Sequence, residues 1–197
     1  NLNLTYGVKD GIVSHCGEID ENSLKPRDEY INLYDYNFSN QFKPYTWEAC
    51  VVKIADKIAY LGRDIQDAIT TGILDGHLKE LREVMNIEEN GKINNTIITN
   101  YLVYDLCENS SEEEGLRFSN SAFEFMNKLK KFNYKYIYLD ERLKPSTEYF
   151  NLILNTIYNT LIKYYDDKEH ARRMYPEIIV EFENWLKMYW NANRDEK

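Results

Sequence analysis

The stretch Trp47–Ile69, WEACVVKIADKIAYLGRDIQDAI, decides the fold, because its apolar residues recur with the period of an α-helix. A rotation of about 100° per residue gathers one set of apolar side chains on one face, as in a helix that is buried on one side. Thr46 can act as the N-cap, and Gly72 suits the left-handed residue that follows a helix. The stretch therefore predicts one long helix. The buried face is predicted to consist of Val51, Ile54, Ile58, Leu61, Ile65 and Ile69.

The opposite face of this helix is polar and carries an ordered set of functional groups. Its members are Lys53, Asp56, Tyr60, Asp64 and Asp67, with Lys57 at the edge. Residues four apart are neighbours on a helix, so Asp56, Tyr60 and Asp64 form one stripe of two carboxylates and a phenol. Such a stripe is either a water-exposed face or a binding surface. The sequence of the helix by itself leaves both open.

Composition and charge limit the class of protein. The 197 residues are 43% hydrophobic and 14% aromatic, which predicts a globular chain with a real core. The formal net charge of -9 argues against a nucleic-acid backbone or an anionic membrane as the partner. Three cysteines without paired spacing, and no apolar run of membrane-spanning length, predict a cytoplasmic protein with reduced thiols.

The rest of the sequence predicts helices joined by loops, and therefore an all-α fold. Polar residues 16–45 and the acidic residues 110–115 predict loops, and Asn90-Gly91 predicts a turn. Asp75 is the expected cap of the third helix, Pro145 suits a first helical turn, and Pro176 is expected to kink or restart the last helix. The further helices are expected at 4–15, 76–86, 92–107, 119–139, 149–165 and 170–190.

Several of these helices carry apolar patterns of their own. Strands are the alternative for Ile97–Thr99 and for the segment FNYKYIYL, 132–139, where β-branched or aromatic residues cluster. The same region contains a basic and aromatic cluster, Lys128–Lys135, that nucleic acid could bind, although the net charge disfavours this. Leu4, Val8 and Ile12 recur every four residues, as in a helix. Leu152, Ile153, Ile157 and Leu161 are expected to pack in the core, and the stripe of Ile178, Phe182, Trp185 and Tyr189 is expected in the core or at a subunit interface.

Two segments together resemble a known family. IADKIAYLGRDIQDAI (54–69), preceded by LTYGVKDGIVSHCGE (4–18), resembles the deoxynucleoside triphosphate triphosphohydrolases of the HD-domain superfamily, the dGTPase-like enzymes. The resemblance is close over residues 4–74 and loose beyond. It implies an irregular, HD-domain-like helical bundle, in which residues 1–75 are the C-terminal part of the phosphohydrolase core and residues 76–197 a helical region packed on it. A DYIxGMTD-like segment of many relatives is missing, which leaves the subfamily and any regulatory site open.

The resemblance also implies a reaction and a site. Asp56 matches the last metal ligand of the family, for Mg²⁺ or Mn²⁺, and Lys57 matches a position that meets substrate phosphate. Tyr60 and Asp64 match residues that contact the deoxyribose near its 3′-hydroxyl. The implied substrate is a dNTP, with dGTP favoured, and the products are a deoxynucleoside and inorganic triphosphate. A homo-oligomer is also implied. His15 is expected near the substrate pocket without a catalytic role, or else as a surface or capping histidine.

The HD metal site needs a His, a His-Asp pair and a distant Asp, and this chain has no His-Asp pair. His15, His77 and His170 are followed by Cys16, Leu78 and Ala171, and the sequence begins at Asn1 rather than Met. We therefore expect the C-terminal part of a longer enzyme, inactive by itself and unable to retain the metal. The general acid and base cannot be named. The alternatives are a stand-alone helical protein without a metal site, another HD phosphohydrolase, and a non-catalytic helical oligomerisation domain.

Overall fold

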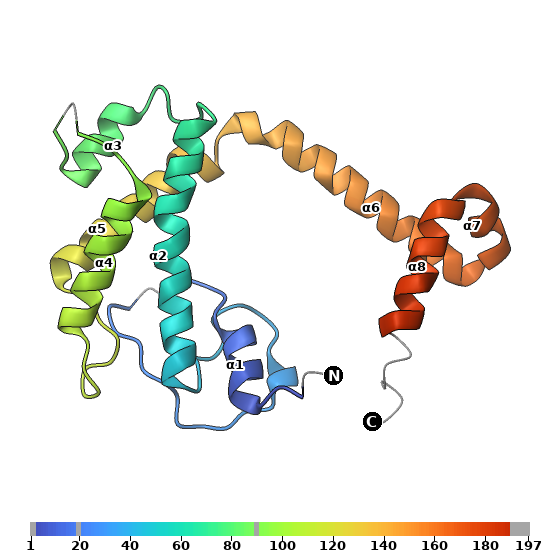
Figure 1. The fold of residues 1–197 in the computed structure, drawn as a ribbon, viewed down its shortest axis with the longest axis horizontal. Coiled ribbons are helices and arrows are strands. Elements are labelled where there is room, and N and C mark those ends of the chain that lie inside the picture. The colour runs from blue at the N-terminus through green and yellow to red at the C-terminus, as the bar shows by residue number, and fades with distance from the viewer. Residues whose placement is uncertain (1–2, 19–20, 89–90, 190–197) are drawn as a thin grey trace. The chain divides into compact units, whose positions relative to one another are not determined.

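The protein is all-α in the part of the chain that the structure describes. The computed structural model describes residues 3–18, 21–88 and 91–189, and within these ranges it contains no β-strand (Figure 1). They form two compact units, residues 3–140 and a unit that begins at Glu141. The division expected after residue 75 falls inside the first unit and stays a prediction. The helices are α1 (Tyr6–Ser14), α2 (Trp47–Thr70), α3 (Leu78–Met85), α4 (Asn95–Asn109), α5 (Asn120–Asn133), α6 (Lys144–Asp166), α7 (Lys168–Met174) and α8 (Pro176–Tyr189).

Helix α2 is the central element of the first unit, and both of its predicted ends are confirmed. The Thr46 side chain accepts a hydrogen bond from the Ala49 backbone N–H at 3.2 Å. Gly72 follows the helix with φ of +75°, in the left-handed region that glycine adopts without a Cβ clash. The helix contacts α1, α4 and α5, and α3 packs on α5 (Figure 1).

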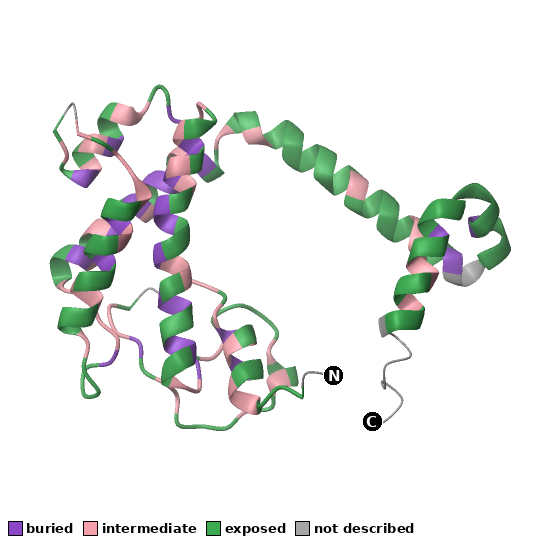
Figure 2. Cartoon of the chain, in the orientation of Figure 1, coloured by how far each residue is buried: buried purple, intermediate pink, exposed green. Residues whose placement is uncertain are grey.

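The core of the first unit runs along α2 and the facing sides of α4 and α5 (Figure 2). Ile54, Ile58, Leu61 and Ile65 are buried as predicted, and Ile69 packs against them while partly exposed. A side chain at Gly62 would collide with Asn95, so this glycine lets the start of α4 lie directly against the middle of α2.

The burial predicted for the first turns of α2 is wrong at two positions. Val51 is 51% exposed, whereas Lys53, expected on the open polar face, is 2% exposed. The reason is that α1 packs on the side of α2 that carries Ala49, Cys50 and Lys53. The sequence of a helix does not show that different neighbouring helices cover different sides of it along its length.

Helix α1 lies against α2 through small residues rather than through its apolar stripe. A Cβ at Gly11 would lie 3.3 Å from the Ala49 Cβ, so the glycine allows the close backbone contact that its place in a helix predicts. Leu4, Val8 and Ile12, which recur every four residues in the sequence, are exposed. Val8 and Ile12 border an open hollow between α1 and α2 instead of packing in the core.

Lys53 joins the end of α1 to α2. Its Nζ donates hydrogen bonds to the backbone carbonyl oxygens of Ser14, His15 and Cys16 at 3.0, 3.3 and 2.6 Å. These carbonyls lie at and just beyond the last residue of α1, where a helix leaves acceptors without partners and where its dipole attracts positive charge. Burial, and then the nearby Lys57, lower the pKa of this ammonium.

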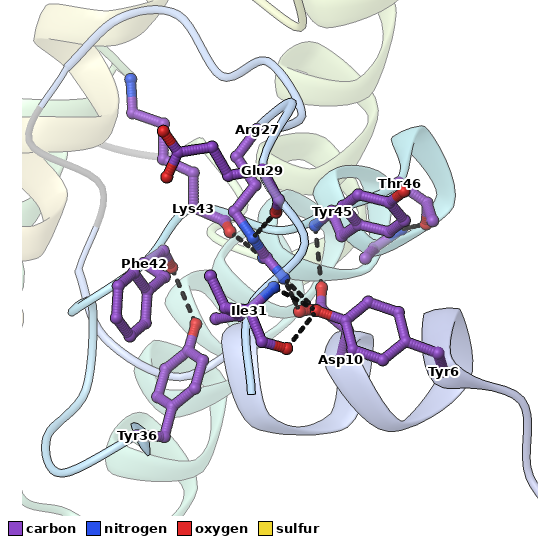
Figure 3. A network of polar contacts seen from close by, with 11 residues as sticks. Tyr6, Asp10, Arg27, Glu29, Ile31, Tyr36, Phe42, Lys43, Tyr45 and Thr46 are labelled. Carbon is purple, nitrogen blue, oxygen red and sulfur yellow. Dashed lines mark hydrogen bonds and ion pairs between the residues drawn. The ribbon is translucent and has the colours of Figure 1, made fainter. Parts of the chain in front are cut away.

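A buried ion pair fastens the long segment 16–45 to α1 (Figure 3). Asp10 is fully buried and contacts the guanidinium of Arg27, and its second oxygen accepts from the Tyr45 backbone N–H at 2.8 Å. Arg27 also donates to the Tyr6 hydroxyl at 2.8 Å and to the Glu29 carbonyl at 2.9 Å. In its described residues, 16–18 and 21–45, the segment is therefore an ordered loop, as expected, and the helical turn found there is the short 3₁₀ turn Leu33–Asp35.

The other sequence predictions for the first unit are mixed. Asp75 does not cap the third helix, which begins at Leu78 with His77 in the cap position, because Leu74 is drawn into the core and carries the turn further. The strand alternatives are wrong. Ile97–Thr99 lie in α4, and FNYKYIYL spans the end of α5 and the π-helical turn Tyr134–Tyr138. The turn predicted at Asn90 lies outside the described residues.

The second unit has a small core. Pro145 lies in the first turn of α6 and Pro176 starts α8 after a break, as predicted. Of the α6 residues expected inside, Leu152 and Ile157 are 65% and 43% exposed, and only Leu161 packs on the core formed by Tyr164, Ala171 and Ile179. In α8 the buried residue is Ile179, not Ile178, because α7 covers the adjacent face. The Tyr189 side chain lies outside the described residues.

Replacing Arg27 should strongly destabilise the first unit. Arg27→Met leaves the Asp10 carboxylate buried without its cation, so we expect the free energy of unfolding in urea to fall by about 3 kcal/mol. The matched control is Arg63→Met, which removes an exposed pair with Asp67 and should change stability by less than about 0.5 kcal/mol. Equal effects of the two substitutions would contradict the assignment.

Replacing Lys53 should loosen the end of α1. Lys53→Met keeps most of the side-chain volume but removes the donor to three carbonyls, so we expect a loss of about 1–3 kcal/mol. Hydrogen exchange should also become faster at the amides of residues 14–18. The exposed Lys79→Met on α3 serves as the control and should leave both measurements unchanged. Wild-type stability of the Lys53→Met variant would show that the hydrogen bonds from Lys53 to the three carbonyls do not stabilise the fold.

Candidate functional site

A pocket of about 300 Å³ lies between α2 and α5, and we call it the α2–α5 pocket. Lys57, Tyr60 and Asp64 all line it, so the three residues predicted to contact substrate lie together. They reach one pocket because successive spacings of three and four residues place them on one side of α2. The remaining lining residues are Glu18, Leu61, Met126, Lys130, Asn133, Tyr134 and Tyr138.

One side of this pocket is a cluster of three charged side chains. The Glu18 carboxylate lies 3.0 Å from Lys130 Nζ and 3.9 Å from Lys57 Nζ. The two lysines come from different helices, α5 and α2, and their side chains are only 26% and 24% exposed. Two half-buried ammonium groups facing one point form a place where an anion binds favourably.

The other side of the pocket holds a phenol and a carboxylate in contact. The Tyr138 hydroxyl donates a hydrogen bond to Asp64. Burial raises the pKa of Tyr138, and the adjacent Asp64 carboxylate raises it further. The phenol is therefore a permanent hydrogen-bond donor at ordinary pH.

Asn133 closes the inner end of the pocket. It is fully buried, and its Nδ2 donates to the Leu61 carbonyl at 3.1 Å. Its Oδ1 is buried and accepts no hydrogen bond from any residue that the structure describes. A buried acceptor of this kind suits a donor group on a bound molecule.

Asp56 faces a second, larger hollow, the α1–α2 groove, of about 690 Å³. His15 lines the same groove, as do the apolar side chains of Val8, Ile12 and Val52. Asp56 and Lys57 are adjacent in sequence and so point about 100° apart on the helix. A single helix therefore lines both the groove and the pocket.

The residues present do not by themselves make a metal site. Across the described ranges, no three His, Cys, Asp or Glu side chains lie close enough together to hold a metal ion. Asp56 supplies one carboxylate, and a single ligand does not hold Mg²⁺ or Mn²⁺. The expected metal therefore does not fit the described residues alone.

Sequence reasoning missed the side of the pocket that α5 contributes. Lys130 was considered as part of a basic and aromatic cluster that nucleic acid could bind, and Tyr138 was given no role, yet both line the pocket. A signal was present, because Lys130, Tyr134 and Tyr138 repeat the four-residue spacing of Asp56, Tyr60 and Asp64. Glu18 gave no such signal, because it lies in a loop without a period.

Known relatives of the chain share a name. No protein-family model matches the chain, and no solved structure does. A deoxyguanosinetriphosphate triphosphohydrolase-like protein of Clostridium perfringens (strain SM101 / Type A) is 30% identical over 183 residues, 91% of this chain and 46% of the relative. Proteins of the same name from Caldanaerobacter subterraneus and Rickettsia conorii are 30% and 35% identical over 75% and 53% of this chain, and 35% and 27% of their own lengths.

The fold and the site define an all-α protein with a polar pocket of ligand size along one long helix. The chain is homologous to the deoxyguanosinetriphosphate triphosphohydrolase-like proteins, so the resemblance seen in the sequence is confirmed over most of its length. It spans less than half the length of each of these relatives. None of the helices in the described part of the chain is long and apolar enough to cross a membrane.

The contact between Tyr138 and Asp64 can be tested by titration. In Asp64→Asn the carboxylate that favours the neutral phenol is gone, so the pKa of Tyr138 should fall towards the ordinary value of about 10 and remain above it through burial. The measurement is the ¹³Cζ chemical shift of labelled tyrosines against pH. Asp67→Asn, on the same helix and outside the pocket, should leave the titration unchanged, and identical curves for the two variants would exclude the contact.

Proposed function

We propose that the chain is part of an HD-type dNTP triphosphohydrolase and supplies the sugar- and phosphate-binding side of its active site. The observation that carries the proposal is the meeting of Lys57, Tyr60 and Asp64 in one pocket with Lys130 opposite. The names of the relatives support the class of enzyme.

The proposed roles follow from the chemistry of the lining groups. Lys57 and Lys130 hold the negatively charged phosphate chain, and Tyr60 and Asp64 bind the deoxyribose, with the Asp64 carboxylate accepting from the 3′-hydroxyl. In the reaction, a water oxygen bonds to the α-phosphorus and the bond from that phosphorus to the 5′-oxygen breaks. The deoxynucleoside leaves with a proton on its 5′-oxygen, and inorganic triphosphate is the second product. dGTP is the favoured substrate.

The burial of the carboxylates favours this proposal over a merely solvated stripe. A water-exposed helix face would leave its carboxylates open, whereas Asp56 and Asp64 are half-buried and each lines a hollow. Asp67, the next acidic residue along the helix, is exposed and lines neither hollow. Of these three carboxylates, the two that the resemblance selects, Asp56 and Asp64, are thus the two that a ligand could contact.

Asp56 is proposed as one ligand of a divalent ion, Mg²⁺ or Mn²⁺, whose other ligands the described residues do not supply. We therefore propose that this chain alone retains no metal and is inactive, and that the active protein is longer. The three free cysteines agree with a cytoplasmic protein. The exposed apolar side chains of α6, among them Phe150 and Leu154, agree with a homo-oligomer.

The test is release of inorganic triphosphate from dGTP and the other dNTPs, with Mg²⁺ or Mn²⁺, by the longer enzyme that contains this chain. Asp56→Ala should lower the rate at least ~100-fold, because removing even an outer-shell partner of a metal site costs 10–100-fold. Asp67→Ala, an exposed carboxylate three turns along the same helix, should retain activity. Full activity of Asp56→Ala, with its fold intact by circular dichroism, would remove Asp56 from the site. This chain alone should release none.

A further inference from the structure

Glu18 occupies the point at which Lys57 and Lys130 converge. Its two carboxylate oxygens are shared between them, Oε2 with Lys130 Nζ at 3.0 Å and Oε1 with Lys57 Nζ at 3.9 Å. A carboxylate held between two ammonium groups carries the same charge and offers the same acceptors as one oxygen edge of a phosphate. Glu18 therefore fills the position that the proposed function assigns to the substrate's phosphates.

The backbone that leads to Glu18 is held in place by contacts at Cys16, Gly17 and Glu18 itself. The Cys16 carbonyl accepts from the buried Lys53 at 2.6 Å. Gly17 has φ of +92°, and a side chain there would collide with Asn40, whose Nδ2 contacts the Glu18 carbonyl. The chain thus turns at a residue that only glycine suits, and it delivers the next side chain to the pocket.

The Glu18 carboxylate, unlike the Glu18 backbone, can move away from the two lysines into solvent. The side chain is 40% exposed at the rim of the pocket, and carboxylate–ammonium pairs that are partly open to water are weak, each contributing roughly 0–1 kcal/mol. A rotation about the Glu18 side-chain torsions moves the carboxylate into solvent and leaves the backbone of residues 16–18 in place. A held backbone that carries a movable carboxylate is the arrangement expected of a removable counter-ion.

We propose that Glu18 is a built-in counter-ion of the phosphate site, which the substrate's phosphate chain must displace in order to bind. The inference rests on the proposed function. Among the residues that the structure describes, the charged side chains lining the α2–α5 pocket are Glu18, Lys57, Asp64 and Lys130, and their formal charges sum to zero. A singly charged anion that displaces Glu18 merely exchanges one negative charge for another. A triphosphate instead brings several negative charges to the same two lysines. The counter-ion therefore favours highly charged ligands over singly charged ones.

The experiment is a calorimetric titration of this chain with inorganic triphosphate at low ionic strength. Glu18→Gln keeps the shape of the side chain and removes its charge, so it should bind triphosphate about 3- to 10-fold more tightly than wild type. The matched control is Glu21→Gln, which makes the same charge change three residues away, where Glu21 pairs with the exposed Lys43 at 3.2 Å. It should bind like wild type. A Lys57→Met/Lys130→Met double variant locates the binding.

The outcomes separate this inference from the proposed function. Tighter binding by Glu18→Gln alone supports the counter-ion. Equal or weaker binding by Glu18→Gln, with binding lost in the double lysine variant, overturns the counter-ion and leaves the phosphate site standing. Equal tightening by Glu18→Gln and Glu21→Gln also overturns it, because a general charge effect then explains the change. Binding that is absent, or unaffected by loss of both lysines, removes the phosphate site and with it both proposals.

Discussion

One buried ammonium group joins α1 to α2 and places the residues that line both hollows. Lys53 lies on α2 and donates to the carbonyls of Ser14, His15 and Cys16, at and just beyond the last residue of α1, so the two helices are joined where one of them ends. That contact places the residues that come next. His15 is brought to the α1–α2 groove and Glu18 to the α2–α5 pocket, which makes one structural hydrogen-bonded centre responsible for parts of both hollows.

The local features of the fold were predictable, and the features that depend on distant neighbours were not. The length of α2, its Thr46 cap and its Gly72 end follow from short-range chemistry, as does the meeting of Lys57, Tyr60 and Asp64 on one side. The burial of Lys53 depends on where α1 ends, and a helical period does not contain that information. For the same reason Val51 was assigned to the wrong environment.

The candidate site shows why net charge is a poor guide to what a protein binds. The sequence carries a formal charge of -9, yet two lysines from separate helices converge in a half-buried pocket. Coulomb energies fall with distance and are screened by salt within about 10 Å, so the nearest groups dominate. Only the packing of α5 on α2 brings Lys130 within reach of Lys57, and composition carries no trace of it.

The continuity of α2 from Trp47 to Thr70 has a consequence for how such a site can change. Asp56 and Asp64 are eight residues apart on one continuous helix, so about 12 Å of rigid rise separates them. The helix fixes the distance between these two carboxylates, because one cannot shift along the axis without the other. A change in the size or shape of the hollows must therefore arise on the facing surfaces, in α5 and in the loop that carries Glu18.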